Sequence, residues 1–198
     1  MITLTDAART RLLEMLKAEG HEGYAIRLRV RGRDNRNYVY DFRPVKHSDK
    51  GAGDEVVDAD GLTIYLDPAT AQRVQGATVG LSVEQMGRLV IDNPNTVWQD
   101  EAASAVADLI EDRINPSIAV HGGRVALVDY DEHIAYIDMQ GGCQGCGLAT
   151  VTLRQGIERL ILDEVPTVKS IVDVTAHEQG ENPFFRRGQE GGSPLIKE

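Results

Sequence analysis

The sequence predicts an α+β fold made of two small domains, the first mostly β and the second with the element order α-β-β-α-β. Before residue 92 the chain is dominated by short alternating segments typical of strands, and after residue 100 by longer helical periodicity. The run Asp92-Asn93-Pro94-Asn95 separates the two patterns with turn-forming residues. We therefore place the domains at residues 1–95 and 100–176, and we interpret the polar, glycine-rich residues 177–198 as a flexible tail.

In the first domain a helix should begin at Thr5-Asp6 and stop near Gly20, with an apolar face made of Ala8, Leu12, Leu13 and Leu16. The alternating segment from Tyr24 to Val30 predicts a strand that turns Arg27 and Arg29 to solvent. A turn over residues 32–37 and mostly antiparallel strands should follow. The predicted elements are a strand with Tyr38, Tyr40 and Phe42, strands at 56–57, 62–66, 77–83 and 88–91, and a short helix opened by Asp67-Pro68.

In the second domain a helix from about Asp100 should end at Asn115-Pro116, because proline interrupts helical hydrogen bonding. Two strands, at 124–130 and 134–139, are predicted to meet at an Asp131-Glu132 turn. A second helix over 148–163 precedes a third strand at 168–174, and Val165-Pro166 separates them.

Composition excludes several classes of protein. The net charge of -10 argues against non-specific nucleic-acid binding, which needs a basic surface. No apolar run reaches the roughly 20 residues of a membrane span, and the amino-terminal residues do not resemble a signal peptide. We therefore expect an acidic, soluble, cytoplasmic protein whose two cysteines are reduced thiols.

The chain's only two cysteines, Cys143 and Cys146, lie three residues apart in the sequence Gly-Gly-Cys-Gln-Gly-Cys-Gly over residues 141–147. At this spacing both thiolates can bind one metal centre, as in zinc and iron–sulfur sites. The positive end of the helix that follows favours the thiolate form. The glycines leave room for an inorganic cluster and free backbone N–H groups to donate hydrogen bonds to sulfur.

Counting ligands points to a dimer. A [4Fe–4S] cluster or a tetrahedral metal takes about four protein ligands, and one chain supplies two cysteines. The nearest histidine, His133, has a surface or turn role as the simpler interpretation. A second copy of the same loop across a two-fold axis would complete the site. Because such a cluster is exposed and is released when the dimer separates, it suits a carrier better than an electron-transfer centre.

Three other interpretations of the cysteine pair remain open at this point. Cys-x-x-Cys at a helix start is also the signature of a dithiol–disulfide oxidoreductase, although thioredoxin-like folds place it after a first βα unit. A structural zinc site would need two further ligands at suitable spacing. The pair could also be unliganded thiols with a structural role only.

The second half resembles the Nfu domain family, which is also the C-terminal part of the NifU scaffold. The resemblance covers about residues 100–176 and is carried by Asn115-Pro116, Gly122-Gly123 and the Gly-Gly-Cys-x-x-Cys run, in this order. It implies a [4Fe–4S] cluster, one per homodimer, that is held by Cys143 and Cys146 of each chain and handed to apo-proteins.

The first half resembles the A-type (HesB-like) iron–sulfur carrier domain over about residues 1–95. The matching pieces are Leu28-Arg29-Val30 leading to Tyr38, Asp60-Gly61 with Asp67-Pro68, and Asp92-Asn93-Pro94-Asn95. A-type carriers place cysteines where this chain has Asp34-Asn35-Arg36 and just after Asn-Pro-Asn, where it has Thr96-Val97-Trp98-Gln99. A half without these ligands is interpreted as a docking module for clients or a donor scaffold.

The predicted function is a non-enzymatic carrier for iron–sulfur protein maturation, with no nucleic-acid or membrane partner. Gly122-Gly123 should form a tight turn, and His121 should be partly buried or solvent-facing rather than tune the site. Trp98 should pack into the domain interface rather than mark a partner surface. Five arginines form a basic stripe that is either a solvated strand face or a docking patch for an acidic client: Arg27, Arg29, Arg31, Arg33 and Arg36.

Overall fold

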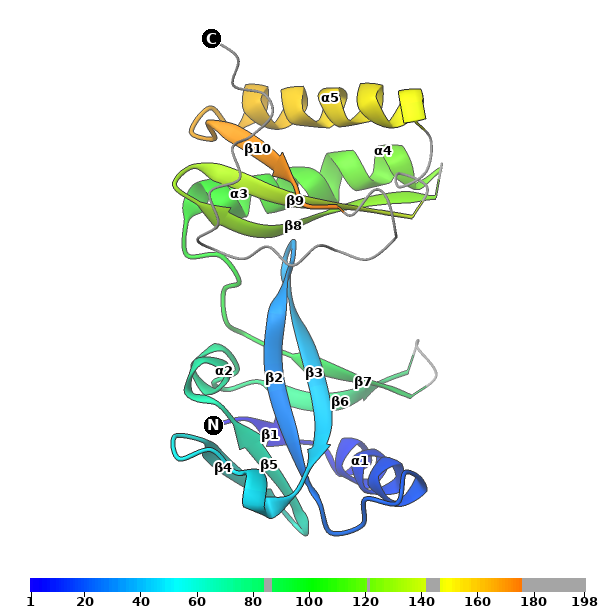
Figure 1. Ribbon diagram of the computed structural model, residues 1–198, viewed down its shortest axis with the longest axis vertical. Helices are drawn as coiled ribbons and strands as arrows, with labels where there is room; N and C mark the ends of the chain where they lie inside the picture. Colours follow the sequence, from blue (N-terminus) through cyan, green and yellow to red (C-terminus); the bar gives the residue numbers. More distant parts are fainter. Residues whose placement is uncertain (84–86, 121, 142–146, 176–198) are drawn as a thin grey trace. The chain divides into compact units, whose positions relative to one another are not determined.

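The computed structural model describes residues 1–83, 87–120, 122–141 and 147–175, with the side chains of residues 147–151 excepted (Figure 1). The chain divides into two compact units, Met1–Gln99 and Asp100–Glu198. In the described residues, no helix has both the length and the apolar character needed to cross a bilayer.

Unit 1 contains two sheets, with strand orders β3-β2-β5-β4 and β1-β6-β7 (Figure 1). Its strands are β1 (Thr3–Leu4), β2 (Ala25–Asp34), β3 (Asn37–Val45), β4 (Glu55–Ala59), β5 (Leu62–Leu66), β6 (Thr78–Ser82) and β7 (Arg88–Asp92). Its helices are α1 (Asp6–Ala18), the short 3₁₀ helix η1 (His47–Asp49) and α2 (Pro68–Arg73).

The local signals for the two helices of unit 1 are confirmed. The Thr5 side chain accepts a hydrogen bond from the Ala8 amide and caps α1, and Asp67 caps α2 by accepting from the Thr70 amide. Leu12 and Leu16 of α1 are buried in the core of the unit, whereas Leu13 is 36% exposed and lies outside the apolar face. Burial of one face therefore explains why α1 is stable on the sheets.

Strand pairing in unit 1 is mixed. The sequence predicted mostly antiparallel strands and did not predict two parallel strand pairs. β2 pairs with β5 in parallel, and β1 pairs with β6 in parallel. The predicted turn over residues 32–37 was also too long. A bulge lets β2 continue to Asp34, so the turn is only Asn35-Arg36, with Asn35 at φ 48°.

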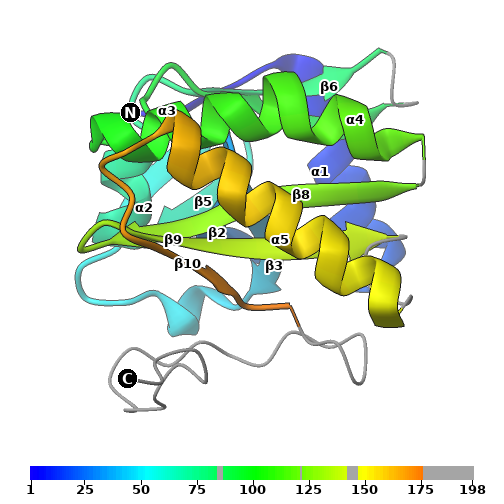
Figure 2. The same ribbon diagram turned by 90° about the horizontal axis from the view of Figure 1, so that it is seen from above.

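Unit 2 has the predicted order α-β-β-α-β, which confirms the α+β class. One sheet with strand order β10-β9-β8 packs against helices, and α5 crosses this sheet beside α3 and α4 (Figure 2). The elements are α3 (Glu101–Leu109), the π turn η2 (Ile110–Ile114), α4 (Asn115–Ala119), β8 (Gly123–Asp131), β9 (Ile134–Gly141), α5 (Gly147–Glu164) and β10 (Ser170–Asp173).

The core of unit 2 joins the helices to one face of this sheet. Cross-strand partners Val125 and Met139 are both fully buried, and so are Leu127 and Ile137. The apolar helix residues that are buried with them are Ala103, Val106, Ile110, Ile114, Ile157 and Ile161. This alternation fixes which face of β9 turns to the helices, and hence how the strand enters the cysteine loop.

Two boundaries in unit 2 differ from the sequence prediction. The helix does not end at Asn115-Pro116, because the Asn115 amide bonds to the Ile110 carbonyl and the wider π turn carries the chain into α4. Pro116 lies in the first turn of that segment, where a missing N–H costs little. The hairpin turn is Glu132-His133, at φ 49° and 69°, and not Asp131-Glu132.

Candidate functional site

Cys143 and Cys146 lie in residues 142–146, outside the described residues, but both ends of their loop are described. β9 ends at Gly141, and α5 begins at Gly147, directly after Cys146. The helix is 18 residues long. Its first backbone N–H groups have no partner within the helix, and they give this end of the loop a positive potential that favours thiolates.

Three glycines form the base of the cysteine loop. Gly123 and Gly141 are register partners at the end of the β8–β9 ladder. Gly122 has φ +69° and its amide donates to the Ala119 carbonyl, at 2.9 Å. Gly141 has φ +64°, and a β-carbon there would collide with the Gly122 carbonyl oxygen. The predicted tight turn at Gly122-Gly123 thus lies directly beside the strand that leads to Cys143, while His121 lies outside the described residues.

Asn115 fixes this end of the sheet from the helix side. Its side-chain oxygen accepts from the Val125 amide at 2.8 Å, and its side-chain nitrogen donates to the Val125 carbonyl at 3.0 Å. β8 is an outer strand of its sheet, so the amide of Asn115 takes the place of a missing neighbouring strand. In the sequence, Asn115-Pro116 predicts a helix end and is part of the family resemblance, and neither indicates this contact with Val125.

β10 supports β9 on its other edge. The Met139 amide donates to the Thr175 side chain at 2.6 Å, and the Val174 amide donates to the Ile137 carbonyl at 2.9 Å. The two contacts hold β9 at Ile137, near its middle, and at Met139, two residues before Gly141. Thr175 is 6% exposed, and a polar residue directly after an apolar strand was the only sequence signal for it.

His133 lies at the end of the β8–β9 hairpin that is opposite Gly141, where the cysteine loop begins. It occupies the turn that joins β8 to β9, whereas Gly123 and Gly141 pair at the opposite end of the hairpin. Between them β9 runs from Ile134 to Gly141, about 23 Å at roughly 3.3 Å per residue. Within the described residues, no group of three or more His, Cys, Asp or Glu side chains could hold a metal ion.

In unit 1 the two segments that replace cysteine positions of A-type carriers lie together. The Trp98 indole N–H donates to the Asn35 carbonyl at 2.6 Å, and the Arg33 guanidinium carbon lies 4.6 Å from the Trp98 ring centroid. An aromatic ring, a backbone carbonyl and a cation therefore meet there. This set contains no sulfur ligand for iron.

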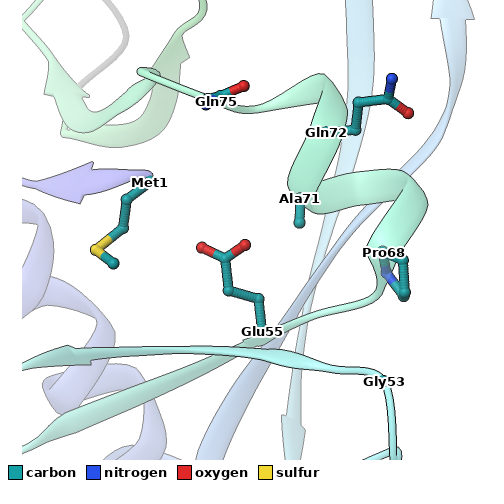
Figure 3. Close-up of a pocket in the computed structure, with 7 residues that line it drawn as sticks. All are labelled: Met1, Gly53, Glu55, Pro68, Ala71, Gln72 and Gln75. Atoms are coloured by element: carbon teal, nitrogen blue, oxygen red, sulfur yellow. The ribbon is translucent and has the colours of Figure 1, made fainter.

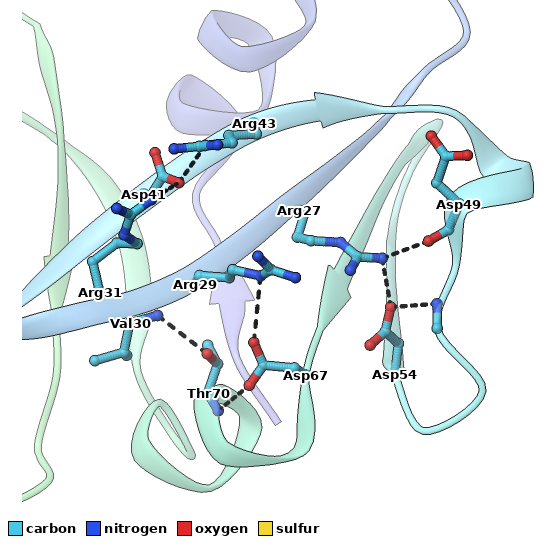
Figure 4. A network of polar contacts seen from close by, with 11 residues as sticks. Arg27, Arg29, Val30, Arg31, Asp41, Arg43, Asp49, Asp54, Asp67 and Thr70 are labelled. Atoms are coloured by element: carbon cyan, nitrogen blue, oxygen red, sulfur yellow. Dashed lines mark hydrogen bonds and ion pairs between the residues drawn. The ribbon is translucent and has the colours of Figure 1, made fainter. Parts of the chain in front are cut away.

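Three of the five arginines in the basic stripe pair with acidic side chains of their own unit (Figure 4). Arg27 pairs with Asp54 at 2.7 Å, and their side chains are 15% and 6% exposed, so the prediction that Arg27 faces solvent was wrong. Arg29 and Arg31 are about half exposed and lie 3.6 Å from Asp67 and Asp41. Paired charges of this kind offer an acidic client little net attraction.

A pocket with a volume of about 420 Å³ also lies in unit 1. The Glu55 carboxylate points into it between Met1 and Ala71 (Figure 3). Its other lining residues are Gly53, Pro68, Gln72 and Gln75. No thiol or imidazole lines the pocket, so its donor set does not suit an iron–sulfur cluster.

Both halves of the chain match known protein families. Residues 1–101 match the iron-sulphur cluster biosynthesis family, and residues 106–172 match the NifU-like domain family. The Fe/S biogenesis protein NfuA of Stenotrophomonas maltophilia strain R551-3 is 34% identical over 95% of this chain and 98% of its own. This chain belongs to the NfuA family of Fe/S biogenesis proteins. NfuA of Xanthomonas axonopodis pv. citri strain 306 is 32% identical over 94% of this chain and 98% of its own.

Membership of the NfuA family confirms the predicted combination of an A-type-like half with a NifU-like half. Among solved structures, IscA with the [2Fe-2S] cluster is 26% identical, with a TM-score of 0.39 over 48% of this chain and 84% of that one. Escherichia coli SufA is 23% identical, with a TM-score of 0.39 over 48% of this chain and 82% of that one.

Proposed function

We propose that this NfuA family member carries a [4Fe–4S] cluster on Cys143 and Cys146 of two copies and delivers it to apo-proteins. The observation that carries the proposal is the placement of the chain's only two cysteines between the end of β9 at Gly141 and the start of α5 at Gly147. Thiolates are the usual ligands of iron–sulfur clusters. Glycines at both ends of the loop, Gly141 and Gly147, carry no side chain that would crowd a cluster.

The number of ligands that a cluster needs supports a site that is shared by two copies of the chain. A [4Fe–4S] cluster takes four cysteine ligands, and one chain has two. In the part of the chain that the structure describes, no group of three or more His, Cys, Asp or Glu side chains could hold a metal ion by itself. The simplest arrangement that supplies four thiolates is two copies related by a two-fold axis, each contributing the same loop.

Delivery follows from ligand exchange. A client thiolate binds an iron atom, the Cys143 or Cys146 thiolate leaves that iron, and the exchange repeats until the cluster rests on the client. Each step replaces one iron–sulfur bond with another, so the exchange itself needs no oxidant or reductant. The cluster is the cargo, and the protein is a carrier rather than an enzyme. Unit 1, which lacks cysteine, serves as the docking module for clients or a donor scaffold.

The same cysteine pair could instead act as a dithiol oxidoreductase, because α5 begins directly after Cys146. The element order argues against it, since the pair follows an α-β-β segment rather than a first βα unit. We place the carrier in the cytoplasm, where thiols stay reduced and available as ligands.

Anaerobic reconstitution with iron and sulfide, followed by chemical counting and a mass measurement, tests the proposal. We expect about two irons and two sulfides per chain, in a dimer, from the stoichiometry of a shared [4Fe–4S] cluster. Cys143→Ser and Cys146→Ser should each abolish cluster retention while far-UV circular dichroism stays unchanged. A fully loaded monomer would contradict the shared site. Colourless protein that reduces a model disulfide catalytically would favour the oxidoreductase instead.

A further inference from the structure

The segment that leaves unit 1 is fastened to that unit by asparagine side chains. The Asn93 amide donates to the Tyr40 hydroxyl at 2.7 Å and to the Arg73 carbonyl at 2.9 Å. The Asn95 side chain donates to the Gln75 carbonyl at 2.8 Å. These contacts tie the segment that directly follows β7 to β3 and to the end of α2.

Aromatic residues continue the attachment. The Tyr38 hydroxyl donates to the Thr96 carbonyl at 2.9 Å. Trp98 is 6% exposed, its indole N–H donates to the Asn35 carbonyl at 2.6 Å, and Arg33 covers the ring at 4.6 Å. A buried indole with its N–H bonded and a guanidinium over its face is a well-anchored side chain.

Unit 2 begins almost at once after this anchor. The Asp100 side chain caps α3 by accepting from the amides of Ala102 at 2.7 Å and Ala103 at 3.2 Å. Gln99 is therefore the only residue between Trp98, which is anchored in unit 1, and the capping residue of α3. We propose that residues 93–98 form a strap, and that Trp98 is the positioning residue that reduces the connection between the units to Gln99.

The strap changes the length of free chain between the units. If residues 93–99 were all free, their root-mean-square span would be about 15 Å, against about 6 Å for a single residue. The local concentration of one module at another falls roughly as the -3/2 power of linker length. Resting on the proposed function, in which unit 1 docks clients and unit 2 holds the cluster, the strap keeps the cargo close to a docked client.

Trp98 is the only tryptophan of the chain, so its emission reports the strap directly in the full-length protein. We expect blue-shifted emission that acrylamide quenches several-fold less than in urea. In ¹⁵N relaxation, Asn93 and residues 95–98 should show heteronuclear Overhauser effects as high as those of β2, with a drop confined to Gln99. Low values from residue 95 onward, or Trp98 quenched as in the unfolded chain, would overturn the proposal.

Two variants distinguish a positioning role of Trp98 from an effect on the stability of unit 1 alone. Trp98→Ala should lose the high Overhauser effects at residues 96–98 and shorten the rotational correlation times of both units. Inserting three Gly-Ser pairs after Gln99 should shorten those times to the same extent, while Trp98 quenching stays at its original value. Unchanged correlation times in the insertion variant would refute the strap's role in limiting motion. Iron content after reconstitution should be unaffected in both variants, so failure of the strap and failure of the carrier proposal are distinguishable.

Discussion

The carbonyl oxygen of Gly122 occupies the space in which a β-carbon on Gly141 would lie. Gly141 also has φ +64°, a conformation that costs a residue with a side chain about 1–2 kcal/mol. Two glycine motifs that are about 20 residues apart in the sequence are therefore one structural feature. Together they let β9 leave the sheet and enter the cysteine loop without obstruction.

Gly141→Ala should destabilise unit 2 by about 2–3 kcal/mol, because left-handed strain adds to the displacement of the Gly122 carbonyl. The same change should lower the iron retained after reconstitution, since the base of the cysteine loop must shift. Urea denaturation followed by far-UV circular dichroism, with an iron count, measures both effects.

Gly156→Ala is the matched control for this substitution. Gly156 lies within α5, has no positive φ, and has nothing within 4 Å of its added β-carbon. Alanine should therefore stabilise the helix by up to about 1 kcal/mol and leave the iron content unchanged. If Gly141→Ala behaved like Gly156→Ala, the close approach of Gly122 and Gly141 would not matter for the loop.

Asn115→Ala should cost unit 2 about 1–3 kcal/mol, because two hydrogen bonds to the Val125 backbone are lost at the edge of the sheet. We expect the Val125 amide to lose hydrogen-exchange protection as the edge of β8 opens. Ser117→Ala is the control, since Ser117 donates only to the nearby Ile114 carbonyl within the helical segment. Equal losses for the two variants would show that Asn115 acts only within its helix.

Burial raises the pKa of Tyr40 above its ordinary value, a hydrogen bond from Asn93 lowers it in part, and Tyr38 raises it slightly. The folded state thus keeps the Tyr40 proton to higher pH than the unfolded state does. Stability from this group is fully present below the unfolded pKa of about 10 and is lost as pH rises through the folded pKa.

Tyr40→Phe should accordingly flatten the alkaline decline in the stability of unit 1. Urea midpoints measured between pH 9 and 11, with Trp98 fluorescence as the probe, give this slope. Tyr130, whose pKa is raised by burial and by Asp100, belongs to unit 2, so Tyr130→Phe should leave the slope of unit 1 as it was. An unchanged slope in Tyr40→Phe would show that Tyr40 does not set the alkaline limit.

Elements with strong local signals were predicted well from the sequence. The caps Thr5 and Asp67 fixed the starts of α1 and α2, and the apolar run at β5 gave its bounds, Leu62–Leu66. Predictions failed where partners distant in the chain decide the outcome. The parallel pairing of β2 with β5, and the bulge that extends β2 to Asp34, depend on strand contacts that no local pattern records.

The candidate site, too, was predicted only in part from the sequence. Cys143 and Cys146 stay a prediction from sequence, made from ligand chemistry and spacing, because their loop lies outside the described residues. The residues that fix the β8–β9 hairpin before that loop, Asn115 on β8 and Thr175 on β9, became visible only in the fold. Each acts through a hydrogen bond to a backbone group at least ten residues away, and such a bond leaves no periodic trace in the sequence.

Composition alone sets the number of cysteine ligands that each chain can offer. That number is two, and it already implies a second copy for a four-ligand cluster. The contact between Gly122 and Gly141, and the anchoring of Trp98 beside Asn35, follow from the fold and could not be derived from composition or spacing. Such meetings depend on the register of strands and on packing between distant segments, which local sequence patterns do not specify.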